Sequence, residues 1–446
     1  MKLSRPGIQL RSELETTCAD IAPQFKSAPR VVPSLRENFA WTFAGNVLYA
    51  GCQWGMLSVL AKLGSTSIVG QFTLGLAISA PVFMFTNLQL RAVQATDVNA
   101  ESGFADYFTL RLLATLLGLM LIFGLLPFAG VSAAVRMVII LVSVSKCVEC
   151  MSDVTAGLLQ REEQLKLVAI SLMIRGVASV AVFSSIFAYF RSLPFSLAGM
   201  IGAWAAVLVL YDLPNVRRFG RCHDSFFRFD RRALLRLAKL GLPLGWVATL
   251  SSLTTNIPRY FLQHHMGLAD QGIFASLAYV VVAINLVVNA LCQSVTTRLA
   301  RLFVDGSLRQ FTTLLTKLCM FGVLVIVAGV PLTFVVGEPL LTLLYRPEYA
   351  DHVGMLALLV AVMGLQTLGS FLVGGLTAAR MFKAQFPVYS LAVLAAIAGS
   401  SILVPRFGLI GAGSALFLSM MTITLGCLWV LCSVLRTRSL TLAESR

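Results

Sequence analysis

Residues 135–160 read VRMVIILVSVSKCVECMSDVTAGLLQ, an apolar run of membrane-spanning length that carries three charges between positions 146 and 153. Lys146, Glu149 and Asp153 stand at positions i, i+3 and i+7, so on an α-helix they share one face, and the opposite face stays apolar. Charges at bilayer depth are costly and normally face a bundle interior or a water-filled path. This face therefore predicts a substrate or ion pathway, and a purely structural Lys146–Glu149 pair is the alternative.

The composition of the whole chain is that of a polytopic membrane protein. Of its 446 residues 57% are hydrophobic and 12% charged, and the mean hydropathy is +0.83; a soluble domain carries roughly 25% charge. Lys and Arg total 35 against 20 acidic residues, but the excess lies in tails and short loops, which indicates membrane topology and not nucleic-acid binding. The N-terminal residues 1–38 contain no continuous apolar run, so neither a signal peptide nor a lipid-attachment signal is expected.

About twelve apolar segments follow along the chain, in two groups of six. They lie near 40–62, 68–90, 109–130, 135–160, 167–190 and 194–214, then near 238–264, 271–296, 313–336, 352–378, 384–404 and 408–434. This predicts an all-α membrane protein with two six-helix lobes, 39–214 and 238–434. An arginine-rich linker, 215–237, joins them, and the tails are 1–38 and 435–446.

The basic residues set the predicted orientation. Most of them lie in the N-terminal tail, the linker, every second loop and the C-terminal tail. The opposite side holds only Lys62, Arg136, Arg191, Arg259, Arg346 and Arg406. The positive-inside rule therefore places both termini in the cytoplasm.

The two groups of segments resemble each other at a shift of about two hundred residues. The matched positions are Gly64 with Gly267, Gly70 with Gly272, Phe72 with Phe274 and Asn87 with Asn289. Six spans per half return the chain to the same side, so the halves are predicted to be parallel repeats around an axis along the membrane normal. That is a transporter architecture with its substrate site between the lobes.

The charges of the fourth segment meet a further cation in the fifth. Counting 1.5 Å per residue from the intervening loop puts Arg175 level with the gap between Glu149 and Asp153, which predicts an ion pair across this hairpin. Lys146 and Arg175 can bind an anionic head group, because guanidinium matches phosphate oxygens. Glu149 or Asp153 can take up H⁺ or Na⁺ when the cation turns to substrate.

Other polar positions are less decisive. Asn46, Asn87 and Asn289 lie in predicted spans and either line a sugar-sized cavity or bridge helices. Cys147 and Cys150 form a CxxC without a second ligand pair nearby, so no metal site and no cofactor is expected.

These positions, taken together, are similar to one known family. The stretches that carry the likeness are 38–46 (NFAWTFAGN), 63–64, 69–72, 87–91 (NLQLR), Lys146 with Glu149, 152–153, 157–158, Gln160, 175–176, 256–261 (NIPRYF), 272–274, 298–300 and 408–412 (GLIGA). The chain resembles the Wzx-type oligosaccharide flippases of bacterial polysaccharide synthesis, in the multidrug/oligosaccharidyl-lipid/polysaccharide (MOP) superfamily. The resemblance implies a V-shaped bundle, as in the MATE transporters of that superfamily, and places Arg259 in the first helix of the second lobe, facing the cavity. In much of the family an Asp precedes that Arg, whereas here Pro258 does.

The resulting prediction is a non-enzymatic flippase of the bacterial cytoplasmic membrane. It moves polyprenyl-pyrophosphate-linked oligosaccharide for exopolysaccharide or lipopolysaccharide synthesis by alternating access, with H⁺ or Na⁺ coupling as an option. Its partners are the lipid-linked oligosaccharide and membrane lipids, with a polysaccharide polymerase and glycosyltransferases as further candidates. The alternatives are a drug/cation antiporter of the same superfamily and a membrane-embedded polymerase or glycosyltransferase. No outward loop is long enough for a catalytic domain, which disfavours the enzyme.

Overall fold

Helices make up the described part of the chain, and it contains no β-strand. The computed structural model describes residues 35–97, 102–219, 226–305, 307–379 and 381–444. Within these ranges, 8 helices are long and apolar enough to cross a membrane. The prediction of an all-α, multi-pass membrane protein is confirmed, and the count of twelve spans stays a prediction.

In its described residues the first lobe contains five long helices, the shorter helix α8 and four short helical segments. Its helices are α2 (Leu35–Leu63), α3 (Thr66–Thr86), α4 (Leu90–Thr96), α5 (Phe104–Leu125), η1 (Leu126–Ala129), α6 (Ala133–Arg161), α7 (Leu165–Phe190), α8 (Leu193–Val207), the π-helical turn η2 (Leu208–Asp212) and α9 (Leu213–Phe219). The segment predicted as a linker, 215–237, thus holds the end of α9 and the start of α10, and the predicted N-terminal tail overlaps the start of α2. Residues 1–34 and 220–225 lie outside the described ranges.

The second lobe contains α10 (Arg231–Met266), α11 (Leu268–Val304), α12 (Leu308–Leu344), η3 (Pro347–His352), α13 (Val353–Ala378) and α14 (Phe382–Glu444). α14 turns at Gly408, whose φ of 54° is in the region that favours glycine. Its two arms run back along each other, since the Ser419 hydroxyl donates to the Ala392 carbonyl at 2.9 Å. The predicted segments 384–404 and 408–434 are these two arms.

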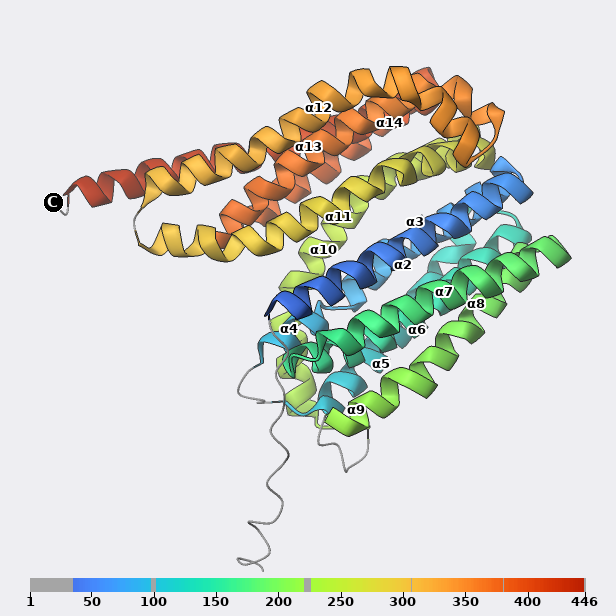
Figure 1. The fold of residues 1–446 in the computed structure, drawn as a ribbon, viewed down its shortest axis with the longest axis horizontal. Coiled ribbons are helices and arrows are strands. Elements are labelled where there is room, and N and C mark those ends of the chain that lie inside the picture. The colour runs from blue at the N-terminus through green and yellow to red at the C-terminus, as the bar shows by residue number, and fades with distance from the viewer. Residues whose placement is uncertain (1–34, 98–101, 220–225, 306, 380, 445–446) are drawn as a thin grey trace, which may run out of the picture.

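The two lobes form a V in Figure 1. They lie close together where α3 and α11 begin and diverge toward the ends where α2 begins and α11 ends. We call the first region the closed end, defined by Thr66, Gly70, Leu268 and Gly272, and the opposite region the open end.

Two glycines allow the helices to touch at the closed end. A Cβ on Gly70 would collide with the Leu268 carbonyl, and one on Gly272 would collide with the Thr66 carbonyl. Each glycine therefore packs on the turn that begins the other helix, which is the reciprocal contact expected of repeats around a two-fold axis. Beside them, the buried Thr73 hydroxyl donates to the Gln271 side-chain oxygen at 2.9 Å.

α10 connects the lobes on the side of α3. A Cβ on Gly241 or Gly245 would meet the carbonyl oxygen of Leu88 or Phe85 at 2.5 and 2.8 Å, so the first half of α10 lies against the last turn of α3. There α3 breaks from α4, because Leu88 and Gln89 take positive φ values of 50° and 49°. α10 thus starts on the first lobe and ends in the second, where it packs extensively on α14.

Candidate functional site

The charged face of α6 lies inside the bundle. The Lys146 ammonium and the Glu149 carboxylate form an ion pair at 2.7 Å, and their side chains are 28% and 31% exposed. Charges this far along a membrane helix need a partner or an open aqueous path. Lys146 and Glu149 supply that partner to each other, and both side chains are only partly exposed.

Tyrosines from both lobes lie within electrostatic range of this pair. Tyr49 of α2 interacts electrostatically with Lys146, Glu149 and Arg175. Tyr279 of α11 interacts in the same way with Lys146 and also with Arg259. Tyr279 is thus a neighbour that Lys146 of the first lobe and Arg259 of the second lobe have in common.

Arg175 lies behind Tyr49 in the first lobe. Gly176 lets α7 approach α2, since a Cβ there would stand 3.3 Å from the Tyr49 Cα. The Arg175 guanidinium then packs over the rings of Tyr49 and Trp204, 5.5 and 5.7 Å from their centroids. It is 7% exposed, and its Nε and Nη1 have no hydrogen-bond partner.

Two carboxylates lie within electrostatic range of Arg175. One is Glu149, and the other is Asp212 in the π-turn η2. The Ser171 hydroxyl, one turn before Arg175 on α7, donates to Asp212 Oδ1 at 2.6 Å. These carboxylates reduce the cost of burying the guanidinium and leave its N–H groups available.

Arg259 contributes the cation of the second lobe. Its guanidinium lies 6.0 Å from the Phe274 ring centroid, and its Nε has no hydrogen-bond partner. Pro258 precedes it inside α10, so no carboxylate stands at that position to neutralise it. Arg259 is thus oriented by aromatic groups.

Asp153 lies in a different cluster from the one predicted. Its two oxygens bind Arg91 at 3.2 Å and Arg111 at 2.8 Å, so Asp153 is not the partner of Arg175 in the ion pair predicted across the hairpin. Arg111 is completely buried and also donates to the Asn87 carbonyl at 3.0 Å. Asp153 therefore ties α4, α5 and α6 together at the break after α3, because a buried arginine needs a carboxylate and further acceptors.

The three predicted asparagines fall in different places. Asn46 is exposed on α2, one turn from Tyr49, and its amide donates to the Thr42 carbonyl at 2.8 Å. Asn87 ends α3, with its Oδ1 buried and without a partner. Asn289 lies in α11, and its side chain is outside the described part of the chain.

Tyr49, Tyr279, Asp212 and Arg111 are site or support residues that the sequence pattern does not single out. Asp212 and Arg111 could have been found from the sequence, since both are ionisable residues inside or beside apolar segments. Arg111 was missed because the orientation argument assigns it to a loop. The tyrosines carry no such signal, because aromatic residues are common in membrane helices.

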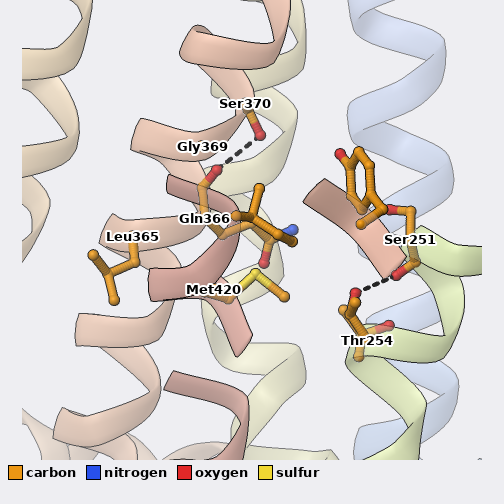
Figure 2. A pocket seen from close by; sticks show the side chains of 10 residues that line it. Ser251, Thr254, Leu365, Gln366, Gly369, Ser370 and Met420 are labelled. Carbon is orange, nitrogen blue, oxygen red and sulfur yellow. Dashed lines mark hydrogen bonds between the residues drawn. The ribbon is translucent and has the colours of Figure 1, made fainter. Parts of the chain in front are cut away.

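A small polar recess lies in the second lobe (Figure 2). It has a volume of about 70 Å³, space for a few waters, and residues of α10, α13 and α14 line it. The Thr254 and Ser370 hydroxyls donate to their own helices, to the Ser251 carbonyl at 2.6 Å and the Gln366 carbonyl at 2.8 Å. Their oxygens remain as acceptors toward the recess.

A family model described as polysaccharide biosynthesis protein matches residues 35–303. The chain belongs to this family. The chain is similar in sequence to the capsular polysaccharide biosynthesis protein CapF of Staphylococcus aureus. The two are 26% identical over 389 residues, which are 86% of this chain and 96% of that protein.

Solved structures place this polysaccharide biosynthesis protein in a known fold. The lipid II flippase MurJ in an inward closed conformation matches with a TM-score of 0.68, 14% identity and 86% coverage of each chain. An inward-facing MATE family multidrug resistance transporter of the MOP superfamily matches with a TM-score of 0.63 and 14% identity, over 93% of this chain and 97% of that one. At these identities the likeness establishes the fold, and the predicted MOP/MATE-like bundle is confirmed.

Proposed function

We propose that this protein is a flippase that moves a polyprenyl-pyrophosphate-linked oligosaccharide from the inner to the outer leaflet of the bacterial cytoplasmic membrane, by alternating access. The observation that carries the proposal is a group of cations from both lobes inside the bundle, which we call the charged centre. Lys146 and Arg175 of the first lobe lie within electrostatic range of Glu149 and Tyr49, and Arg259 of the second lobe shares the neighbour Tyr279 with Lys146. The family match and the capsular polysaccharide relative point to the same class of substrate.

A diphosphate supplies what these cations lack. Buried N–H groups without acceptors are uncommon in folded proteins, and those of the described residues include Nε and Nη1 of Arg175 and Nε of Arg259. Phosphate oxygens accept hydrogen bonds from guanidinium in a matched geometry, and such charge-assisted bonds are stronger than neutral ones. The two arginines bind the pyrophosphate, and polar side chains such as Asn46, which is exposed on α2, border the sugars.

Glu149 is the residue we assign to coupling. When Lys146 turns to the substrate, Glu149 loses its partner at 2.7 Å and gains by taking up H⁺ or Na⁺. Asp153, the other coupling candidate, is already held by two arginines and serves to fix the helices.

Orientation and partners follow from the same proposal. The positive-inside rule puts the open end and both termini in the cytoplasm, so the structure corresponds to a state that loads from the inner leaflet. Polysaccharide polymerase and glycosyltransferases are the enzymes that would deliver and consume the lipid-linked substrate. A drug/cation antiporter fits less well, because Lys146, Arg175 and Arg259 would repel a cationic substrate.

The test is translocation of polyprenyl-pyrophosphate oligosaccharide in proteoliposomes, with and without an imposed pH gradient. We expect Arg175→Gln and Arg259→Gln each to lower the rate by about 10- to 100-fold, in line with roughly 1.5–3 kcal/mol for a charged hydrogen bond. Arg136→Gln is the matched control, since Arg136 is exposed at the other end of α6 and donates to the Val131 carbonyl. Glu149→Gln should transport without responding to the gradient.

Two results count against the proposal. Unchanged translocation in both arginine variants would show that Arg175 and Arg259 do not bind the diphosphate. Transport of organic cations by the wild type, with no movement of the lipid-linked oligosaccharide, would instead favour the antiporter.

A further inference from the structure

An apolar cavity lies between the lobes near the open end, apart from the charged centre. Its volume is about 980 Å³, at the upper end of ligand pockets. The end of α3, α4, the first half of α10, the last turns of α13 and the first turns of α14 line it. The Phe85 and Trp246 rings meet edge to face in its wall, with centroids 5.5 Å apart.

The lining of the cavity is mostly apolar, which favours a hydrocarbon ligand. Val247, Ala248 and Phe386 add apolar surface to the two rings. At bilayer depth such a space holds a lipid chain and not water, because water there would find few hydrogen-bond partners. Whatever occupies the cavity is therefore chain-like and already dissolved in the membrane.

The polar residues of the lining stand at one edge. Lys383 is exposed in the first turn of α14, and Gln89 is at the α3–α4 break. Lys383 makes no ion pair within the described part of the chain. Both residues are at helix ends that the positive-inside rule assigns to the cytoplasmic surface. The cavity thus matches a lipid of the inner leaflet, because a cation lies at the depth of the head group and apolar residues lie deeper in the membrane.

We propose that this cavity is the loading site for the isoprenoid chain of the substrate, with the first units after the pyrophosphate lying against Trp246, Val247 and Ala248 and the phosphates at Lys383. The inference rests on the proposed function. It adds a place where the lipid carrier is recognised before its head group reaches Arg175 and Arg259.

An isoprenoid chain that moves from the bilayer into this cavity was already out of water, so the hydrophobic effect adds little to its binding. Van der Waals packing against the cavity wall favours the bound state. A larger side chain that fills the cavity should therefore weaken binding of the isoprenoid chain moderately. Ten or so lost contacts correspond to about a tenfold change in affinity.

The experiment uses the full chain in lipid nanodiscs and a polyprenyl pyrophosphate with a photoreactive group on an isoprene unit near the phosphates. In the wild type, labelled peptides should come from 242–251 of α10 and 383–389 of α14. Ala248→Trp should reduce labelling about tenfold, whereas Leu240→Trp, on an exposed site of the same helix, should not. Lys383→Gln should weaken labelling and Lys383→Arg should keep it.

Competition separates the carrier from ordinary lipid. Excess unlabelled polyprenyl pyrophosphate should abolish labelling, and the same excess of phosphatidylglycerol should leave it. Equal competition by phosphatidylglycerol, or equal labelling of Ala248→Trp and wild type, would overturn the inference. If wild-type vesicles still translocate the oligosaccharide in that case, the proposed function stands alone; if the wild type neither translocates nor labels, both fall.

Discussion

Replacing Gly272 with alanine is expected to push α3 and α11 apart at the closed end. The added Cβ would stand 2.8 Å from the Gly70 backbone nitrogen and nearer still to the Thr66 carbonyl oxygen, against at least 3.4 Å for an ordinary contact. Both obstacles are backbone atoms, so the helices themselves must move. The adjacent Thr73–Gln271 hydrogen bond at 2.9 Å is stretched at the same time.

The size of the effect follows from these two losses. Overpacking costs about 1–3 kcal/mol, and the net loss of a hydrogen bond adds about 1 kcal/mol. A destabilisation near 3 kcal/mol shifts the closed-end population roughly 100-fold toward states in which this end has opened. Translocation should slow accordingly, because the cycle then returns less often to the state that loads substrate.

Spin labels at Lys62→Cys and Glu348→Cys report the opening, since the Arg346 side chain holds the Lys62 carbonyl at 2.9 Å across the lobes. Pulsed electron resonance should show a longer distance in Gly272→Ala than in the unsubstituted protein. Gly51→Ala is the control, because a Cβ at Gly51 meets nothing within 4 Å. An unchanged distance distribution in Gly272→Ala would refute the claim that these glycines hold the closed end.

Three further outcomes follow from the structure. Asp153→Asn should lower the free energy of unfolding by about 3–5 kcal/mol, since it leaves the fully buried Arg111 without a carboxylate. The loss is measured as a lower melting temperature in detergent. Asp153→Asn combined with Arg111→Met should recover part of the stability, and an equal loss in the double variant would contradict the pairing. Lys146→Met with Glu149→Gln should keep the fold but abolish translocation, whereas a purely structural pair would tolerate this double change. The amides that donate to Asp230 at the start of α10 hold the pKa of its carboxyl below the ordinary value, so its cap is intact above about pH 4 and is lost as pH falls through the lowered pKa. Hydrogen exchange in the first turn of α10 should therefore accelerate at acid pH, and Asp230→Asn should remove that dependence.

Hydrophobicity and charge placement determined much of the architecture. Each predicted apolar segment overlaps a helix or one arm of α14, because a bilayer requires long apolar helices whatever their packing. The repeat was also readable from sequence. Gly70 and Gly272 correspond at a shift of about two hundred residues and meet as reciprocal contacts, since close helix approach tolerates only the smallest residues.

The partners of the charges were only partly readable. The Lys146–Glu149 pair is local, three residues apart on one helix, and helical periodicity was sufficient to predict it. Asp153 was different, because depth along a hairpin says how high a charge lies but not toward which neighbour it points. Arg111 reaches it from α5 across 42 positions of sequence.

Sequence by itself therefore determined the membrane class, the two-fold repeat and the presence of buried charges, since these depend on composition and on spacing along one helix. Tertiary structure alone decided that Tyr279 lies near both Lys146 and Arg259, that Asp153 pairs with Arg91 and Arg111, and that an apolar cavity opens beside α10. The physical reason is that such contacts depend on how helices far apart in the chain rotate and cross, and no local pattern encodes that rotation.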